Sequence, residues 1–149
     1  MDKNNRREEV RMIQRIYNNE ELMAIIIRDS HDNEGIEFLT PDDFSQQLAY
    51  MHHPSGHTII PHFHNLVSRT VHYTQEVLVI KSGKLRVDFY NTNRICINQV
   101  VLQSGDIILL CSGGHGFEVL EEVSMVEIKQ GPYVGENDKT RFEPVKGDD

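Results

Sequence analysis

Hydrophobic and polar residues alternate in short runs along the C-terminal two thirds of the chain. The clearest run, residues 85–90, has Leu, Val and Phe at every second position, with Arg, Asp and Tyr between them. A period of two is typical of a β-strand with one buried face. A continuous apolar strand is predicted at residues 77–80, and further short strands at residues 100–102, 107–110, 117–120 and 124–129. Turns are predicted at residues 82–84 and 91–93. Many short strands between Gly and Asn turns favour a closed barrel or sandwich, because closure removes exposed sheet edges.

The N-terminal part of the chain has a different pattern. Asn5 followed by Glu8 is typical of a helix start. Apolar residues then recur at helical spacing, at Val10, Ile13, Ile16 and Tyr17. The sequence therefore predicts a helix up to about Tyr17, followed by short strands at residues 22–28, 37–39 and 46–53. We expect a helical extension over residues 1–20, a β-domain over residues 21–145 and a disordered tail at residues 146–149.

Composition narrows the function classes. The chain has 149 residues, of which 38% are hydrophobic and 26% charged, as in a soluble domain with a real core. A net charge of −8 argues against nucleic acid as the main partner. The longest apolar run, residues 22–27, is too short to span a bilayer. The first residues lack the apolar core of an export signal, so we expect a cytoplasmic protein in which Cys96 and Cys111 are reduced thiols.

Residues 56–64 read Gly-His-Thr-Ile-Ile-Pro-His-Phe-His. If this segment is a strand, His62 and His64 project from the same face. Glu76 follows at the start of the next predicted strand, and His115 lies in a glycine-rich segment further along. Two histidines on one strand, a carboxylate on the next and a fourth ligand from elsewhere would make a metal site.

This spacing resembles the two sequence motifs of the cupin family. The residues that fit the first motif are Gly56, His62, His64, Glu76 and Gly83. The gap between His64 and Glu76 is eleven residues, where the family usually has three or four. The second motif lies between Gly105 and His115, with Cys111 in place of a Pro and one residue fewer before the His. The motifs and the compatible strands on both sides cover most of the chain.

The resemblance implies an all-β fold, the cupin-type double-stranded β-helix or jelly-roll barrel, here with a short N-terminal helix. It also implies one divalent metal ion held by His62, His64, Glu76 and His115. Mixed nitrogen and oxygen ligands suit Fe, Mn, Ni, Co or Zn, and one or two coordination positions would stay open.

Two classes of function follow. One is a metal-dependent enzyme acting on a small polar or sugar-like molecule, either a dioxygenase or an isomerase or epimerase. The other is a non-catalytic module that binds a small ligand such as a sugar beside a bound metal. Both stay open, because no unmistakable general base stands beside the ligands. A purely structural β-protein is disfavoured, since burying these ligands unpaired would cost several kcal/mol.

Further residues are candidates for contacting a small molecule. Arg69, His72 and Tyr73 lie in the eleven-residue gap, and His72 and Tyr73 are the catalytic candidates. Tethered between two predicted ligands, this loop should project over the barrel mouth, although an ordinary loop role is open for each residue. Tyr133 follows the last strand and either covers the mouth or packs outside it. Both faces of the strand containing Val77 are apolar, so either the N-terminal helix or a second subunit should cover the outer face, and a homodimer is expected.

Overall fold

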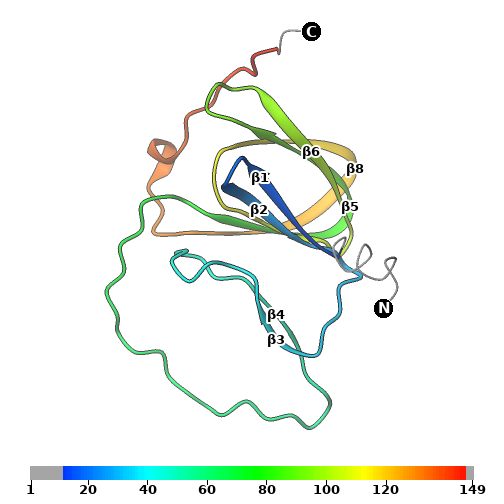
Figure 1. Cartoon of the computed structure of the whole chain (residues 1–149), viewed down its shortest axis with the longest axis vertical. Helices are drawn as coiled ribbons and strands as arrows, with labels where there is room; N and C mark the ends of the chain where they lie inside the picture. The colour runs from blue at the N-terminus through cyan, green and yellow to red at the C-terminus, as the bar shows by residue number, and fades with distance from the viewer. Residues whose placement is uncertain (1–11, 147–149) are drawn as a thin grey trace. The chain divides into compact units, whose positions relative to one another are not determined.

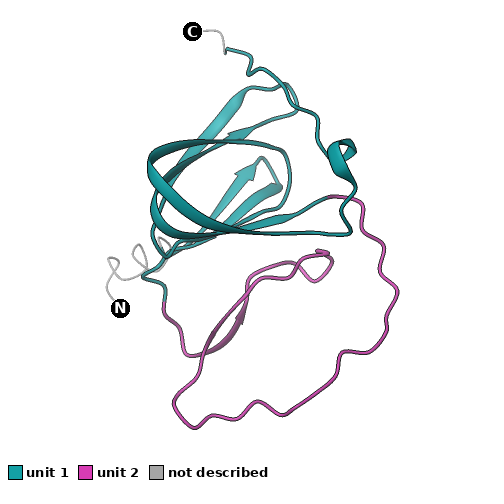
Figure 2. Ribbon diagram, turned by 180° about the vertical axis from the view of Figure 1, so that it is seen from behind, with its two compact units in different colours: residues 1–31, 74–149 teal, residues 32–73 magenta. Residues whose placement is uncertain are grey.

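The computed structural model describes residues 12–146. The chain divides into two compact units, shown in Figure 2. The sheet unit consists of the described residues up to 31 together with residues 74–146, and the hairpin unit consists of residues 32–73. The predicted β-domain therefore spans both units. Of the predicted C-terminal tail, residues 147–149 lie outside the described part of the chain.

One curled antiparallel sheet forms the sheet unit (Figure 1). Its strands are β1 (Ile13–Asn18), β2 (Glu21–Ile27), β5 (Glu76–Tyr90), β6 (Cys96–Gln103), β7 (Ile107–Leu110) and β8 (Gly114–Lys129). They follow the order β1-β2-β7-β5-β6, and β8 pairs with the other edge of β5. The sheet curls into a half-barrel, so the expectation of a mostly β fold is confirmed.

The long strand β5 organises this sheet. Its first part pairs with β7 and its second part with β6, while β8 runs along its opposite edge. The register between β5 and β8 shifts three times between Ile80 and Leu85. At Gly83 the backbone has a φ of +88°, and a Cβ atom there would lie 1.9 Å from the carbonyl oxygen of Glu122. Only glycine fits this close approach.

The inner face of the half-barrel carries the hydrophobic core. Alternate residues of neighbouring strands meet there, because directly paired residues project from the same face. The core consists of Ile16, Met23, Ala24, Ile26, Leu78, Ile80, Leu85, Val87, Phe89, Val100, Leu102, Ile108 and Leu110. Burial of this many aliphatic and aromatic side chains is what stabilises the curled sheet.

The other face of the same strands is also apolar. Val77 pairs with Leu109, and Leu109 pairs with Ile25, so the three side chains form a row opposite the core. All three are buried. The prediction that both faces of the Val77 strand are apolar is confirmed, and the homodimer expected from it stays a prediction.

The hairpin unit contains two short strands, β3 (Gly35–Phe38) and β4 (Ala49–His52), which pair antiparallel. Residues 57–72 form no regular secondary structure. Beyond β8, one 3-10 turn, η1 (Gly135–Asp138), is present in the C-terminal segment of the sheet unit. No helix in the described part of the chain is both long and apolar enough to cross a membrane.

The predicted N-terminal helix is wrong over residues 13–17, which belong to strand β1. A register shift between Ile16 and Tyr17 interrupts the pairing of β1 with β2. Ile16 is buried while Arg15 and Tyr17 on either side of it are exposed, as in a strand. Tyr17 is apolar in type but lies on the exposed side, so the spacing of Ile13, Ile16 and Tyr17 mimics a helix. The first part of the predicted helix, residues 5–11, lies outside the described residues.

Two further local predictions are wrong. The expected turn at residues 82–84 is a distortion inside β5, and the expected strand at residues 56–64 has no strand conformation. Phe63 is 97% exposed there, and this segment pairs with no strand among the described residues. Residue types typical of strands do not form one without a neighbouring strand. The strands expected at residues 77–80, 85–90, 100–102 and 107–110 are confirmed. The two predicted at residues 117–120 and 124–129 are parts of the single strand β8.

Candidate functional site

Glu76 and His115 lie next to each other on the inner face of the sheet unit. Glu76 is the first residue of β5 and pairs with Leu110, the last residue of β7. Five residues after Leu110 the chain has turned into β8, where His115 pairs with Phe89 of the core. The distance between His115 Nε2 and Glu76 Oε2 is 3.9 Å. Two of the four predicted metal ligands are therefore close together.

Glycines make this return of the chain possible. Gly113 has a φ of +76°, a backbone conformation that residues with a Cβ atom rarely adopt. At Gly114 a Cβ atom would lie 3.1 Å from the Cβ of Tyr90 and from the ring of Phe142. His115 itself is the second residue of strand β8.

Burial and neighbouring charges shift the pKa values of this pair. The residue Glu76 is only 8% exposed. Burial is the main cause that raises the pKa of its carboxyl group, and the adjacent Glu127 carboxylate raises it further, while Lys129 and Lys139 oppose the shift. Burial also lowers the pKa of His115, with the charge of Lys139 as the second cause. At neutral pH the imidazole is therefore uncharged and retains a nitrogen lone pair.

A small charged group surrounds the pair. Lys129 Nζ is 3.8 Å from Glu76 Oε1 and 3.2 Å from Glu127 Oε1. Lys129 and Glu127 come from the inner face of β8, because Lys129 pairs with Glu76 and Glu127 pairs with Leu78. The sequence analysis did not select these two residues. The signal that could have found them is alternation, since residues 125, 127 and 129 share one face of a strand.

The other two predicted ligands, His62 and His64, lie in the hairpin unit. Their ring centroids are 5.3 Å apart, and His62 Nδ1 is 2.8 Å from the carbonyl oxygen of Ile60. The substrate candidates Arg69, His72 and Tyr73 follow them in the same irregular segment. Across residues 12–146, no three His, Cys, Asp or Glu side chains are grouped so that they could hold a metal ion. The four-ligand site and the substrate-contacting loop stay predictions.

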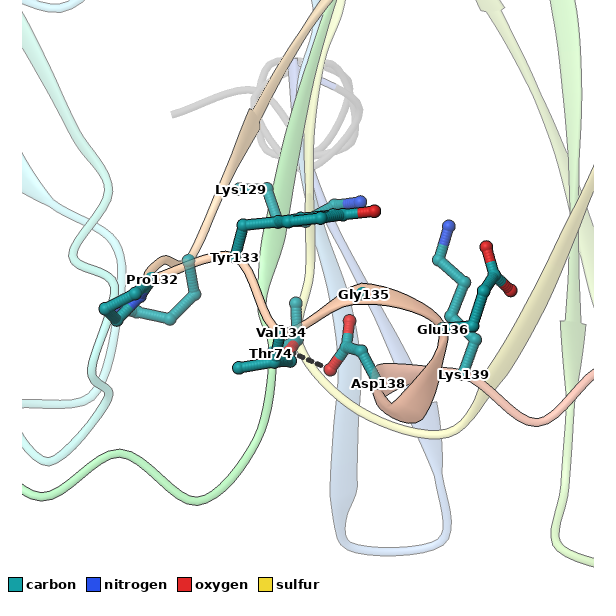
Figure 3. A pocket seen from close by; sticks show the side chains of 10 residues that line it. Thr74, Lys129, Pro132, Tyr133, Val134, Gly135, Glu136, Asp138 and Lys139 are labelled. Atoms are coloured by element: carbon teal, nitrogen blue, oxygen red, sulfur yellow. Dashed lines mark hydrogen bonds between the residues drawn. The ribbon is translucent and has the colours of Figure 1, made fainter.

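The last candidate, Tyr133, lines a pocket of about 110 Å³ in the sheet unit (Figure 3). The pocket lies between the start of β5, the end of β8 and the segment around η1. Its lining residues are Thr74, Lys129, Gln130, Pro132, Tyr133, Val134, Gly135, Glu136, Asp138 and Lys139. The hydroxyl group of Thr74 donates a hydrogen bond to Asp138 across the pocket (Figure 3). Lys129 belongs both to this pocket and to the charged group around Glu76.

Comparison of the chain with protein-family models, with curated proteins and with solved structures gives no significant match. The resemblance to cupins therefore rests on the two motifs in the sequence. A curled antiparallel sheet is compatible with many activities, so function has to be inferred from the side chains of the site.

Proposed function

We propose that this protein is a divalent-metal-binding β-barrel protein of the cupin type, in which Glu76 and His115 are two of the metal ligands. The observation that supports the proposal is the 3.9 Å approach of His115 Nε2 to Glu76 Oε2 on a face that is otherwise largely apolar. A buried carboxylate is costly unless it is paired, and its nearest cation, Lys129, is 3.8 Å away. A bound metal ion would compensate this cost directly.

The chemistry of the pair fits such an ion. Two ligand atoms at about 2.1 Å from one ion, with an angle of about 90–110° between them, are about 3.0–3.4 Å apart. The separation of 3.9 Å is therefore close to that of two ligands of a single ion. His115 is uncharged at neutral pH, which is the form that binds metals. In the proposal His62 and His64 complete the set, and the ion is Fe, Mn, Ni, Co or Zn.

The proposed activity is metal-dependent chemistry on a small polar molecule, with isomerase or epimerase chemistry favoured over oxygenation. A divalent ion polarises a carbonyl or hydroxyl oxygen of its ligand. The specific observation that favours proton transfer is the carboxylate of Glu127, which lies beside Glu76 and is paired with Lys129 at 3.2 Å. Glu127 can accept a proton next to a carbonyl group, and Lys129 can stabilise the resulting negative charge.

Metal analysis of untagged protein, purified without chelators, tests the proposal. Wild-type protein should contain one metal ion per chain, or should gain one on titration with the five ions in turn. An ion at a hundred times its Kd stabilises the folded state by about 2.7 kcal/mol. For a chain of this size that corresponds to an increase in Tm of about 5–11 °C. His115→Ala and Glu76→Gln should lose the increase, whereas the control His57→Ala, outside the ligand set, should keep it.

Two results would contradict the proposal: wild-type protein that neither contains nor gains any of these ions, and ligand variants whose Tm still rises with metal. Activity is tested separately. Isomerisation of sugar-like substrates by the metal-loaded protein should be lost in Glu127→Gln while the metal stays bound. Oxygen uptake with Fe(II) would instead identify a dioxygenase, and ligand binding without turnover would identify the non-catalytic module.

A further inference from the structure

Strand β8 has one edge that pairs with no other strand among residues 12–146. Along its other edge it pairs with β5 from Gly114 to Lys129. The backbone groups of the unpaired edge can therefore accept a further strand. Many side chains of β8 are also exposed, and the large apolar ones among them are Phe117, Val119, Leu120, Met125, Val126 and Ile128. A long edge with apolar side chains on both faces is typical of a place where an extended segment adds to a sheet.

Residues 57–72, which we call the extended segment, have the matching properties. They form no regular secondary structure and run as a single trace in Figure 2. No backbone group of residues 58–72 is hydrogen-bonded to another backbone group of residues 12–146. Large apolar side chains are exposed here too, namely Ile59, Ile60, Phe63, Leu66, Val67 and Val71. The extended segment therefore has the backbone groups and the apolar surface that a strand added to β8 needs.

The two elements also differ in charge. Residues 44–75 contain none of the 23 acidic residues of the chain, and they include Arg69. Strand β8 contains four glutamates, Glu118, Glu121, Glu122 and Glu127. The cations paired with them are Arg86, Lys84 and Lys129, and two of these also lie near the carboxylates of Asp88 and Glu76.

Carboxylates thus outnumber cations along β8. If β8 paired with β8 of another copy, its glutamates would face one another, which is unfavourable. The extended segment brings a cation to the same edge and no carboxylate. Charge therefore favours the extended segment as the strand that adds to β8.

One antiparallel register brings like with like. With His64 opposite Glu127, Leu66 lies opposite Met125 and Phe63 opposite Ile128, so apolar side chains meet on both faces. Arg69 then comes within reach of Glu122. Glu127 and Met125 pair with the core residues Leu78 and Ile80, so the alternate residues 62, 64 and 66 project from the inner face.

The same register directs the histidine pair to the proposed metal ligands. His62 lies opposite Lys129, and Lys129 pairs with Glu76 on β5. Glu76 in turn lies 3.9 Å from His115. Both histidines of the added strand would therefore project beside Glu76 and His115.

This register requires a second copy of the chain. It places Tyr73 beside Glu118, which pairs with Arg86. In its own chain, Tyr73 is three residues before Glu76. Arg86 is ten residues beyond Glu76 on β5, which is about 33 Å along the strand. Three residues span at most about 11 Å. The added strand must therefore come from another copy, and exchange between two copies gives two equivalent contacts.

We propose that two copies of this protein exchange their extended segments, each adding as an antiparallel strand to β8 of the other copy. His62 and His64 of one chain then complete the metal site of Glu76 and His115 in the other. The shared metal site rests on the proposed function, whereas the exchange itself rests on the edge of β8, the apolar surfaces and the charges. A single chain would hold an incomplete set of ligands.

Sedimentation equilibrium of the full chain tests the exchange, and wild-type protein should be a dimer. Arg69→Glu and Glu122→Arg should each raise the Kd of the dimer at least about tenfold, because each brings like charges together at two equivalent positions. The double variant, in which the two charges are interchanged, should regain most of the lost affinity. The control Lys146→Glu, which reverses an exposed cation outside both elements, should dimerise like the wild type.

Mixing of two variants tests whether the metal site is shared. His64→Ala lacks a ligand on the extended segment, and His115→Ala lacks one on the sheet, so each alone should bind no stoichiometric metal. In a mixed dimer, the intact segment of one chain meets the intact sheet of the other. After random subunit exchange, the mixture should bind about one ion per four chains. The control mixture of His62→Ala with His64→Ala should bind none, because both variants lack a ligand on the same element.

The inference is overturned if the wild type is monomeric at the concentrations used for metal analysis, or if interchanging the charges of Arg69 and Glu122 does not restore the dimer. It is also overturned if the mixture gains no metal although the wild type binds it. A monomer that binds metal would leave the proposed function intact. A dimer that follows the charge variants but takes up no metal would refute the proposed function and leave the exchange of segments intact.

Discussion

Replacing Asp106 should be among the most destabilising changes outside the hydrophobic core. Asp106 immediately precedes β7, the strand that positions Glu76, and it is only 5% exposed. Its Oδ1 accepts a hydrogen bond from the N–H of Asp29 at 2.9 Å. Its Oδ2 accepts one from the N–H of Gln103 at 2.8 Å and one from Arg28 Nη1 at 2.9 Å. One carboxylate thus ties the end of β2 to the turn between β6 and β7.

The cost of Asp106→Ala can be worked from these contacts. Arg28 is partly exposed and keeps its hydrogen bonds to the carbonyl of Val101 and the side chain of Gln14. Losing its ion pair with Asp106 therefore contributes little to the loss of stability. The backbone N–H groups of Asp29 and Gln103 each lose a charged acceptor. Each lost hydrogen bond costs about 1.5 kcal/mol, the lower end of the range for hydrogen bonds to charged groups. The free energy of unfolding should fall by about 3 kcal/mol, which corresponds to a decrease in Tm of about 6–12 °C.

Urea unfolding followed by far-ultraviolet circular dichroism at 25 °C measures this change. Asp106→Asn should also be destabilised, because its amide NH₂ group must face one of the two N–H donors. The control Asp43→Ala, at an exposed position, should stay within about 0.5 kcal/mol of the wild type. If the free energy of unfolding of Asp106→Ala is within about 1 kcal/mol of the wild-type value, the hydrogen bonds to the Asp106 carboxylate do not hold the sheet together.

Three other changes test the fold and the site. Gly83→Ala should destabilise the protein by several kcal/mol in urea unfolding, because its Cβ would lie 1.9 Å from the carbonyl oxygen of Glu122; wild-type stability would exclude the close approach. In metal-free protein, the difference in urea midpoint between Glu76→Gln and the wild type should shift in favour of the variant as the pH rises from 4 to 8. The raised pKa of Glu76 means that ionisation costs stability once the pH exceeds the ordinary value of 4.5, and a pH-independent difference would refute this. Maleimide at pH 7.5 should modify the exposed Cys96 and leave Cys111 unmodified until the protein unfolds, since burial raises the pKa of Cys111 to about 12; rapid modification of both thiols would contradict it.

The strands of the sheet unit were largely predictable from local patterns. Residues 85–90 alternate cleanly in the sequence, and their aliphatic and phenylalanine side chains, Leu85, Val87 and Phe89, are core residues. Where the pattern is interrupted, prediction failed. Glu121 and Glu122 separate the two strands predicted at residues 117–120 and 124–129, yet β8 continues through them, because its pairing with β5 extends past the register shifts around Gly83. Local alternation does not show that a partner strand can bend and continue.

The approach of Glu76 to His115 was expected from the resemblance to cupins, and the sheet accounts for it through the pairing of Glu76 with Leu110. Lys129 could have been found from the alternation along β8, which brings it opposite Glu76. The position of Lys139 had no such signal. Lys139 lies in a segment without regular periodicity, and its position depends on how Phe142 packs against Tyr90, a contact between residues 52 positions apart. Contacts of this kind are made by side chains that local sequence does not relate to each other.

The sequence by itself determined a mostly β, acidic chain with regularly spaced strands, and it singled out the residues with metal-binding chemistry. These properties follow from residue type and local spacing, on which hydrophobic burial and ligand chemistry act directly. Only the tertiary structure decided that residues 13–17 extend a sheet, that residues 57–72 form no strand, and that Lys129 of β8 lies 3.8 Å from Glu76. Each of these depends on whether a partner is within reach, because strands and ion pairs are stabilised by groups that come from distant parts of the chain.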